Sequence, residues 1–222
     1  MDEKRYTIRD YKESDYTRCE SLVSNAWDFD RIFQPQGLAN VAKRLYTMSS
    51  VVNSNYFKVV ETDGEVVGFI FGLNEKTTAP RKLPIIRDGL GFLLRLLLLR
   101  GVKYSEKKKL LKAISVHNVN RLTLVKPGRS EITLFVIDPD HQRVGIGKRL
   151  LSDFVSHCKD SGVKSVIVET NTHGASSFYE GVGFKLIGYF DSPLHRYAAW
   201  DGQAGMYEYI SYQDNRGRGN TF

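Results

Sequence analysis

The stretch that most constrains the fold of this chain is residues 131–151, EITLFVIDPDHQRVGIGKRLL. Residues 132–137 are apolar and rich in β-branched side chains apart from Thr133, a pattern typical of a strand covered on both faces. The DPD sequence at 138–140 stops that strand, because proline cannot continue a sheet ladder. The stretch therefore predicts a central strand, a turn and then the glycine-containing start of a helix.

A loop with two glycines follows the turn and leads into the helix. Residues 142–147 read QRVGIG, and KRLL at 148–151 begins an amphipathic helix. Glycines at the mouth of a helix let backbone N–H groups approach an anion, and the helix dipole favours negative charge there. The loop lacks the third glycine of a dinucleotide fingerprint, and Arg149 stands where a P-loop has Ser or Thr. We therefore expect the loop to hold a phosphate-bearing ligand. The loop is neither a dinucleotide-binding loop nor a P-loop.

Two motifs, about thirty residues apart, point to one family. Gln142, Gly145 and Gly147 fill the defined positions of the pattern Q/R-x-x-G-x-G/A. The loop thereby resembles the acetyl-CoA pyrophosphate loop of the GCN5-related N-acetyltransferase (GNAT) superfamily. Residues 171–184, NTHGASSFYEGVGF, are similar to the second GNAT signature, N-x-x-A-x-x-x-Y followed by G-F, with Tyr179 in the place of its tyrosine.

The resemblance implies that acetyl-CoA is the cosubstrate and that the loop and the strand before it hold this molecule. Backbone groups of the strand would pair with the pantetheine arm, and loop N–H groups would hold the pyrophosphate. Thr172 stands where the family usually has Asn, with Asn171 one residue early, which departs from the pattern. The expected cofactor-binding residues are Phe135, Val136, Ile137, Gln142, Arg143, Val144, Gly145, Ile146, Gly147, Lys148, Thr172 and Tyr179.

The resemblance also implies direct transfer of an acetyl group to a primary amine of a small molecule or a protein. An ammonium with a pKa of about 10 must lose a proton before it attacks, so a base or a water relay is expected. Glu131 is the expected base, with Glu169 on the next strand as the alternative base or an acceptor-binding carboxylate. Tyr179 matches the general acid of the family, which protonates the sulfur of CoA. His173 lies next to this site as a further base or acceptor contact.

The order of the elements fits a single α/β domain over residues 1–222. The GNAT fold that the resemblance implies has a mixed, mostly antiparallel central sheet, splayed at the CoA site and flanked by helices. Asp63-Gly64 between two apolar runs predicts a hairpin. Helical periods predict a helix that ends near Trp27 and another over residues 38–48.

The parts without motifs are expected to shape the acceptor side. These are residues 27–37, residues 191–204 and a long segment before the central strand. Residues 213–222 are polar and rich in glycine, which predicts a flexible tail.

Residues 74–130 are predicted to be a basic helical insertion that forms a lid or wall over the acceptor side. They contain 14 Lys and Arg against 3 Asp and Glu, a balance of +11, whereas the rest of the chain has a balance of −4. Residues 90–99 are apolar but broken by Arg95, and they are about half the ~20 residues that a bilayer span needs. They predict a buried or dimer-facing helix, with an interfacial membrane helix as the alternative, and residues 105–116 predict a second helix.

The excess of positive charge in residues 74–130 has two possible interpretations. A solvated helix face is one interpretation, and binding to nucleic acid or to an anionic membrane surface is another. No nucleic acid is expected, because the segment lacks evenly interleaved aromatic residues and a known binding motif. No membrane span is expected, and a homodimer through residues 93–99 stays open.

Cysteine usage and the first residues suggest a cytoplasmic protein. Cys19 and Cys158 are too few for a disulfide framework, and neither has a metal-ligand spacing, so both are expected to be buried thiols. The start of the chain, MDEKR, has no apolar segment, so no secretory signal is expected. The five histidines show no spacing that suggests a metal, and none is expected.

Two classes of function follow. The leading hypothesis is an acetyl-CoA-dependent N-acetyltransferase, and the alternative is a non-catalytic module of the same fold that binds acyl-CoA as a sensor. An acid and a base on the acceptor side distinguish the two, and Tyr179 and Glu131 are the candidates for these roles.

Overall fold

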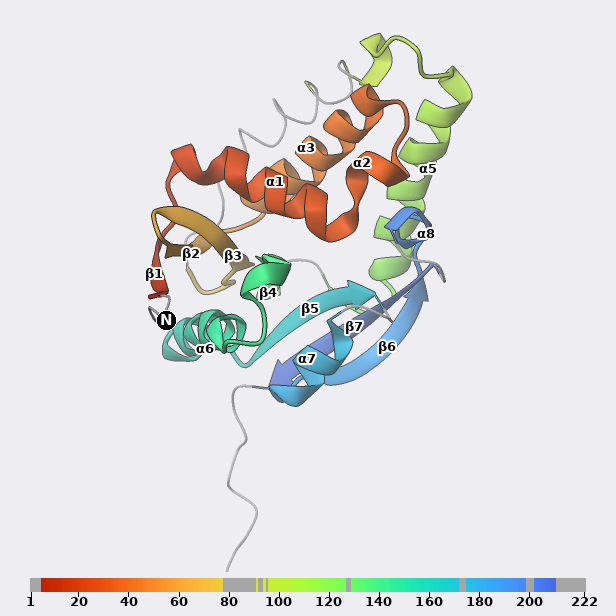
Figure 1. Cartoon of the computed structure of the whole chain (residues 1–222). Helices are drawn as coiled ribbons and strands as arrows, with labels where there is room; N and C mark the ends of the chain where they lie inside the picture. Colours follow the sequence, from red (N-terminus) through yellow and green to blue (C-terminus); the bar gives the residue numbers. More distant parts are fainter. Residues whose placement is uncertain are drawn as a thin grey trace, which may run out of the picture.

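The computed structural model describes residues 5–77, 91, 94, 96–126, 129–171, 175–198 and 202–210 (Figure 1). Several predicted residues and segments lie outside these ranges. They are Thr172, His173, the tail at 213–222 and part of the apolar run at 90–99.

The described strands form one seven-stranded sheet in the order β1-β2-β3-β4-β5-β7-β6. Neighbouring strands are antiparallel except β4 and β5, which are parallel, so the predicted mixed and mostly antiparallel sheet is confirmed. The strands are β1 (Thr7–Asp10), β2 (Tyr56–Thr62), β3 (Glu65–Leu73), β4 (Glu131–Ile137), β5 (Ser165–Asn171), β6 (Lys185–Asp191) and β7 (Gln203–Ile210).

Helices cover both faces of the sheet (Figure 1). The α-helices are α1 (Tyr16–Trp27), α2 (Phe29–Ile32), α3 (Gln36–Val52), α5 (Tyr104–Arg121), α6 (Ile146–Asp160), α7 (Ser176–Gly181) and α8 (His195–Ala198). Two 3-10 turns, η1 (Glu13–Asp15) and η2 (Pro139–His141), precede α1 and follow β4. The helix predicted over residues 105–116 is longer than expected and continues to Arg121.

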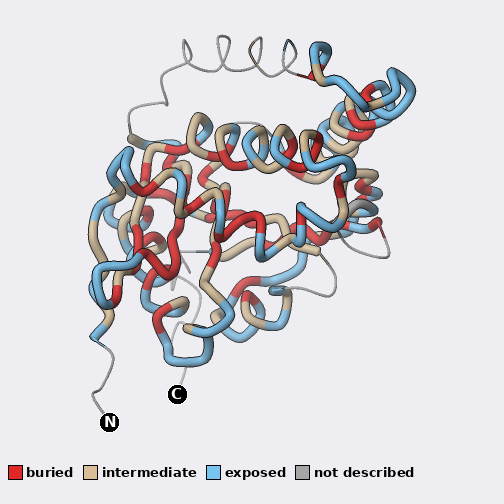
Figure 2. The backbone as a smooth tube through the Cα atoms, turned by 45° about the horizontal axis from the view of Figure 1, so that its top comes forward, coloured by how far each residue is buried: buried red, intermediate tan, exposed pale blue. Residues whose placement is uncertain are grey.

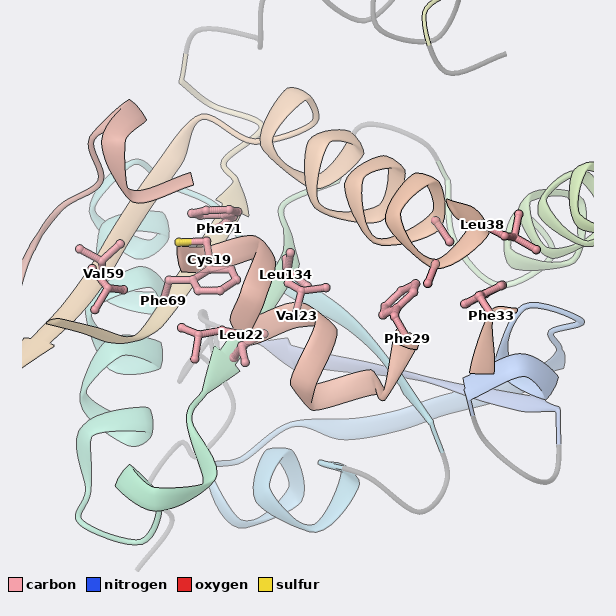
Figure 3. Packing of buried hydrophobic residues seen from close by; sticks show 14 of the residues in the cluster. Cys19, Leu22, Val23, Phe29, Phe33, Leu38, Val59, Phe69, Phe71 and Leu134 are labelled. Atoms are coloured by element: carbon pink, nitrogen blue, oxygen red, sulfur yellow. The ribbon is translucent and has the colours of Figure 1, made fainter. Parts of the chain in front are cut away.

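Two hydrophobic cores hold the helices to the sheet. On one face, Cys19, Leu22 and Val23 of α1 pack against Phe69 and Phe71 of β3, as Figure 3 shows. On the other face, α6 packs its apolar stripe, which includes Leu150 and Phe154, against β2, β3 and β5. Burying apolar side chains on both faces is the main favourable contribution to this layered arrangement.

Many of the buried residues lie in the middle of the molecule, between the helices and the sheet (Figure 2). Both cysteines are buried free thiols, as predicted, and burial raises the pKa of each thiol to about 12.

A β-bulge in β4 changes which side chains share a face. Phe71 pairs with Leu134 and Gly72 pairs with Ile132, so Thr133 is the extra residue. The Thr133 hydroxyl donates to the Phe71 carbonyl oxygen at 3.0 Å, which satisfies a group of the disrupted ladder. Gly72 is required here because a Cβ would lie 2.5 Å from the ring of Phe154.

Strands β4 and β5 pair only where they begin. The register joins Glu131 to Ile167 and Ile132 to Val168, and no later pair is formed among the described residues. Beyond this point β4 stays with β3, while β5 stays with β7 as far as Asn171. The two strands therefore diverge, and the second half of β4 has one edge without a strand partner in this part of the chain. This is the splay predicted for the sheet.

Candidate active site

The glycine loop before α6 has the backbone conformation that an anion site needs. Gly145 is the N-cap of α6 and has a φ of 86°, in the left-handed region that favours glycine. Arg143 has a φ of 63°, which is uncommon for a residue other than glycine and often marks a functional site. The Arg149 N–H donates to the Gly145 carbonyl oxygen at 3.1 Å, and the N–H groups of the first turn have no partner inside the helix.

The loop is fixed against the free edge of β4. The side-chain amide of Gln142 donates to the Ile137 carbonyl oxygen at 3.0 Å, so this motif residue shapes the turn. A Cβ at Gly147 would lie 3.5 Å from Phe135 and 3.9 Å from Phe178. The end of β4, the loop and α7 therefore meet at Gly147, and we call this region the donor half of the site.

Asn171 ends β5 beside the splay and carries an unsatisfied group. Its side-chain oxygen Oδ1 is buried and accepts no hydrogen bond in the part of the chain that the structure describes. Buried polar atoms almost always have a partner, since leaving one unpaired is destabilising. An acceptor of this kind fits an N–H donor of a bound ligand.

Tyr179 lies on α7, between the donor half and the core. It is 4% exposed, and its ring contacts those of Phe178 and Phe184, each with a centroid distance of 5.4 Å. Burial, followed by the nearby Tyr46, raises the pKa of the Tyr179 phenol above its ordinary value. The phenol is therefore protonated at neutral pH, as a proton donor must be.

Glu131 and Glu169 project from the same face of the sheet. Ile132 and Val168 point into the core beneath α6, so their neighbours Glu131 and Glu169 point to the opposite face. The bulge places Leu134 on that opposite face too, where it packs with α1 and α3. The two carboxylates predicted as alternative bases are thus brought together on the side away from α6.

Arg121, the last residue of α5, joins the two carboxylates. Its Nη2 atom lies 2.5 Å from Oε1 of Glu131, and its Nε atom lies 3.2 Å from Oε2 of Glu169. All three side chains are between 16% and 22% exposed. An arginine with this bridging geometry holds both carboxylates in fixed positions.

Two histidines face the remaining oxygen of Glu169. Nε2 of His195 on α8 lies 3.1 Å from Oε1 of Glu169, and Nε2 of His117 on α5 lies 3.6 Å from the same atom. Nδ1 of His117 lies 2.9 Å from the hydroxyl of Ser192, a fully buried residue. A neutral His117 that accepts from Ser192 carries its proton on Nε2, facing Glu169. We call Glu131, Glu169, Arg121, His117 and His195 the acceptor-side cluster.

The pKa values of the two carboxylates in this cluster are shifted in opposite directions. Burial raises the pKa of Glu131 above its ordinary value, and the charge of Arg121 offsets only part of that effect. Burial also acts to raise the pKa of Glu169, but the hydrogen bond from His195 and the charges of His117 and Arg121 outweigh it and lower the pKa. Burial lowers the pKa of His117, which favours its neutral form.

Tyr46 of α3 lies close to the acceptor-side cluster. Burial and then the charges of Glu169 and Glu131 raise the pKa of its phenol. Its ring contacts those of Trp27 and Phe29, with centroid distances of 5.3 and 5.9 Å. The side chain is nevertheless 37% exposed, so this aromatic group borders the cluster and is accessible.

Sequence reasoning missed the residues that complete the acceptor side. His117 and Arg121 are four residues apart and therefore share a face of α5, which is the only signal in the sequence that pairs them. His195 lies in the segment 191–204 that was expected to shape this side, but no pattern assigned it to Glu169. No sequence pattern identified Tyr46 as a site residue, because only its position in a predicted helix could be read from the sequence.

The comparisons with known proteins agree with this geometry. A model of the acetyltransferase (GNAT) domain matches residues 101–190. N-alpha-acetyltransferase RimI of Mycobacterium tuberculosis is 33% identical over 70 residues, which cover 32% of this chain and 44% of that protein. The chain thus spans less than half the length of this curated relative.

Solved structures show the same fold at low sequence identity. The ribosomal-protein-S18-alanine N-acetyltransferase of Escherichia coli has a TM-score of 0.53 at 13% identity, with 97% of this chain and 100% of that chain covered. The YncA protein of Salmonella typhimurium, a putative acetyltransferase solved with acetyl-CoA, has a TM-score of 0.51 at 12% identity, with coverages of 95% and 96%. Residues 101–190 are thus similar to the acetyltransferase (GNAT) domain, and the fold of the chain is that of these acetyltransferase structures.

In the ranges that the structure describes, no three His, Cys, Asp or Glu residues are arranged to hold a metal ion. Among the same residues, no helix is both long enough and apolar enough to cross a membrane.

Proposed function

We propose that this protein is an acetyl-CoA-dependent N-acetyltransferase that transfers an acetyl group to a primary amine by direct attack. One observation carries the proposal. The splay between β4 and β5 leads onto the glycine loop of α6, with the Tyr179 phenol beside the donor half and two carboxylates on the opposite face. That arrangement would provide an anion site, an acid and a base near the point where β4 and β5 diverge.

The residues of the donor half fit acetyl-CoA. The first-turn N–H groups of α6, with Gly145 in a left-handed conformation, suit a pyrophosphate. The free edge of β4 at Phe135, Val136 and Ile137 suits the amides of the pantetheine arm. The unpaired oxygen of Asn171 suits one of the N–H groups of that arm, in place of the contact predicted for Thr172.

Glu131 and Glu169 divide the acceptor-side work. A base is most efficient when its pKa lies near the working pH, and burial moves Glu131 in that direction. Glu169, whose pKa is lowered, stays ionised and attracts the acceptor ammonium. We assign proton removal to Glu131 and binding of the ammonium to Glu169.

The transfer then follows from these positions. The thioester supplies an activated acyl carbon, and the acceptor nitrogen attacks it after losing a proton to Glu131. The new C–N bond forms as the C–S bond breaks, and Tyr179 gives its proton to the departing sulfur. The nitrogen then releases its second proton to give the neutral amide, and the Tyr179 phenolate takes up a proton. Arg121 keeps both carboxylates in place during this exchange.

Acetyl-CoA turnover across a panel of amines tests the function. The RimI relative is named an N-alpha-acetyltransferase, and one structural neighbour with a TM-score of 0.54 at 12% identity is an aminoglycoside 6'-acetyltransferase, so α-amino peptides and amino sugars belong in the panel. Release of free thiol that depends on one acceptor class is the expected result. Tight binding of acetyl-CoA with no turnover of any amine would instead indicate the non-catalytic sensor.

Tyr179→Phe separates binding from catalysis. The variant keeps the ring and its core contacts but loses the proton, so acetyl-CoA should bind normally while kcat falls by about 10²–10⁴-fold. Tyr209→Phe is a matched control, because Tyr209 also packs on Phe184 and is not assigned to the site. Unchanged turnover in Tyr179→Phe would remove this residue from the role of acid.

We propose that residues 1–222 form a single acetyltransferase domain in which residues 74–130 are an insertion, and the position of α5 against the acceptor-side cluster supports its predicted role as a wall. Fractionation of cells tests the expected cytoplasmic location, and light scattering tests the homodimer.

A further inference from the structure

Exposed leucines gather at an edge of the molecule away from the sheet. Leu94, Leu97 and Leu98 are 58%, 57% and 69% exposed, and Leu96 between them is fully buried. Residues three and four apart lie on the same face of a helix, so the three exposed leucines form one surface. Tyr104, at the start of α5 a few residues further along the chain, is also exposed, at 73%. We call these four exposed residues the leucine patch.

The leucine patch is held by a fixed structure. Lys107 is buried and donates from Nζ to the carbonyl oxygens of Leu97 and Leu99, at 2.8 and 2.7 Å. Leu96 and Leu99 pack on the core formed by α1 and α3. The exposed leucines therefore point outward from a turn that is anchored on its other side and capped at its carboxyl end.

Exposed cations follow the leucines along the chain, and we call Arg100, Lys103, Lys108 and Lys112 the rim. Glu106, which pairs with Lys109, is the one acidic residue in the sequence between 96 and 126. The whole segment 74–130 has a balance of +11, whereas the rest of the chain has −4. The exposed leucines are thus followed in the sequence by a segment that is exposed and strongly positive.

This combination favours one kind of partner. A second copy of the chain would bring the same cations face to face in a symmetric dimer, and like charges repel. Nucleic acid would engage the cations but needs no aliphatic surface, because it binds through phosphates and stacked bases. An anionic lipid surface uses both parts, with leucines entering the interface and cations meeting the headgroups.

We propose that the leucine patch and its rim of cations attach this protein to the surface of an anionic membrane. The attachment lies in the interface and does not span the bilayer. Figure 1 shows the start of α5 at the outer edge of the molecule and its end near α8 and the sheet. α5 has 18 residues and is therefore about 27 Å long, so docking would hold the acceptor-side cluster about that far above the lipid.

Binding to vesicles tests the proposal without any assumption about catalysis. The full chain should co-sediment with vesicles of phosphatidylcholine and phosphatidylglycerol at low salt, and much less with phosphatidylcholine alone. The double variant Leu97→Glu with Leu98→Glu should bind about tenfold more weakly or worse. Leu186→Glu with Ile187→Glu, on the exposed edge strand β6, is the matched control and should bind as the wild type does.

Charge variants test the rim. Lys103→Glu with Lys108→Glu should weaken binding about tenfold or more and reduce its dependence on salt. Lys159→Glu with Lys164→Glu makes the same change in net charge on an exposed surface elsewhere and should have little effect. Circular dichroism of each variant establishes that it folds.

Three results would overturn the proposal. Equal binding to charged and uncharged vesicles, or none to either, would exclude an anionic membrane. Salt-sensitive binding of an RNA oligonucleotide that survives the leucine substitutions would assign the cations to nucleic acid. A dimer in light scattering that the leucine substitutions dissociate would assign the patch to a second copy.

Discussion

The donor half and the acceptor-side cluster are built from different parts of the chain. The donor half uses backbone groups of consecutive residues, from the end of β4 through the glycine loop to α6. The acceptor-side cluster uses side chains from α5, β4, β5 and α8, which are far apart in sequence. Backbone recognition requires particular conformations at particular spacings, and it therefore leaves a motif. Side-chain recognition across distant segments requires only that the fold bring them together.

Because the two halves have different proposed roles, substitutions in them should have different effects on binding and on the rate. Under the proposed function, changes in the donor half should alter the affinity for acetyl-CoA, because we assign only binding to that half. Changes in the acceptor-side cluster should alter the rate and its pH dependence, because we assign proton removal to that half.

The largest effect is expected from Glu131→Gln. Glutamine keeps the size of the side chain and its contact with Arg121 but cannot accept the acceptor's proton, so kcat should fall by about 10²–10⁴-fold. The dissociation constant for acetyl-CoA, measured by calorimetry, should be unchanged.

Glu169→Gln is the matched control for this assignment. It should mainly raise the KM for the amine, because Glu169 is assigned to binding of the ammonium. The reverse pattern, with the rate lost in Glu169→Gln and retained in Glu131→Gln, would transfer the role of base to Glu169.

A smaller effect, visible in the pH profile, is expected from Arg121→Gln. The cation lowers the pKa of both carboxylates, so its loss should raise both values. A base must be ionised to act, and a higher pKa means that activity is lost at a higher pH as the solution is acidified. The acid limb of kcat/KM should therefore move to higher pH, with about a tenfold loss of rate below neutrality.

Arg129→Gln controls for the loss of a partly buried ion pair. Arg129 pairs with Glu208 of β7, and its side chain is 33% exposed, compared with 19% for Arg121. This variant should lose some stability but keep the pH profile of the wild type. An acid limb that stays in place in Arg121→Gln would separate Arg121 from the protonation of the carboxylates.

On the donor side, Gly145→Ala should raise the KM for acetyl-CoA about tenfold while kcat changes little. A residue with a side chain is strained at a φ of 86°, which should cost about 1 kcal/mol and distort the loop that faces the pyrophosphate. Gly162→Ala introduces comparable strain at a φ of 77° beyond the other end of α6, and the added methyl group meets no atom within 4 Å at either site. The two variants should lose similar stability, but only Gly145→Ala should bind acetyl-CoA more weakly.

The strand, loop and helix of the donor half were predicted from the sequence, whereas the residues of the acceptor-side cluster were predicted only in part. The strand of residues 132–137, the glycine loop and the helix after it were read from periodicity and turn chemistry, because these are local properties. Arg121 was not identified, because its role depends on α5 extending past residue 116 and on the bulge at Thr133. Neither the exact end of a helix nor a bulge is encoded in hydrophobic periodicity.

The smallest effect is expected from Asn171→Ala, and it tests whether the donor half also uses a side chain. The Asn171 oxygen has no hydrogen-bond partner among the described residues, so its removal should leave the melting temperature unchanged or slightly higher. If the oxygen accepts from the pantetheine arm, the loss of one hydrogen bond should raise the KM for acetyl-CoA by about fivefold. Asn55→Ala is the control with the opposite expectation, because Asn55 accepts from the Asn74 N–H at 2.8 Å and its loss should lower stability but not affinity. A destabilised Asn171→Ala variant with an unchanged KM would mean that Asn171 is structural, and the donor half would then rest on backbone groups alone.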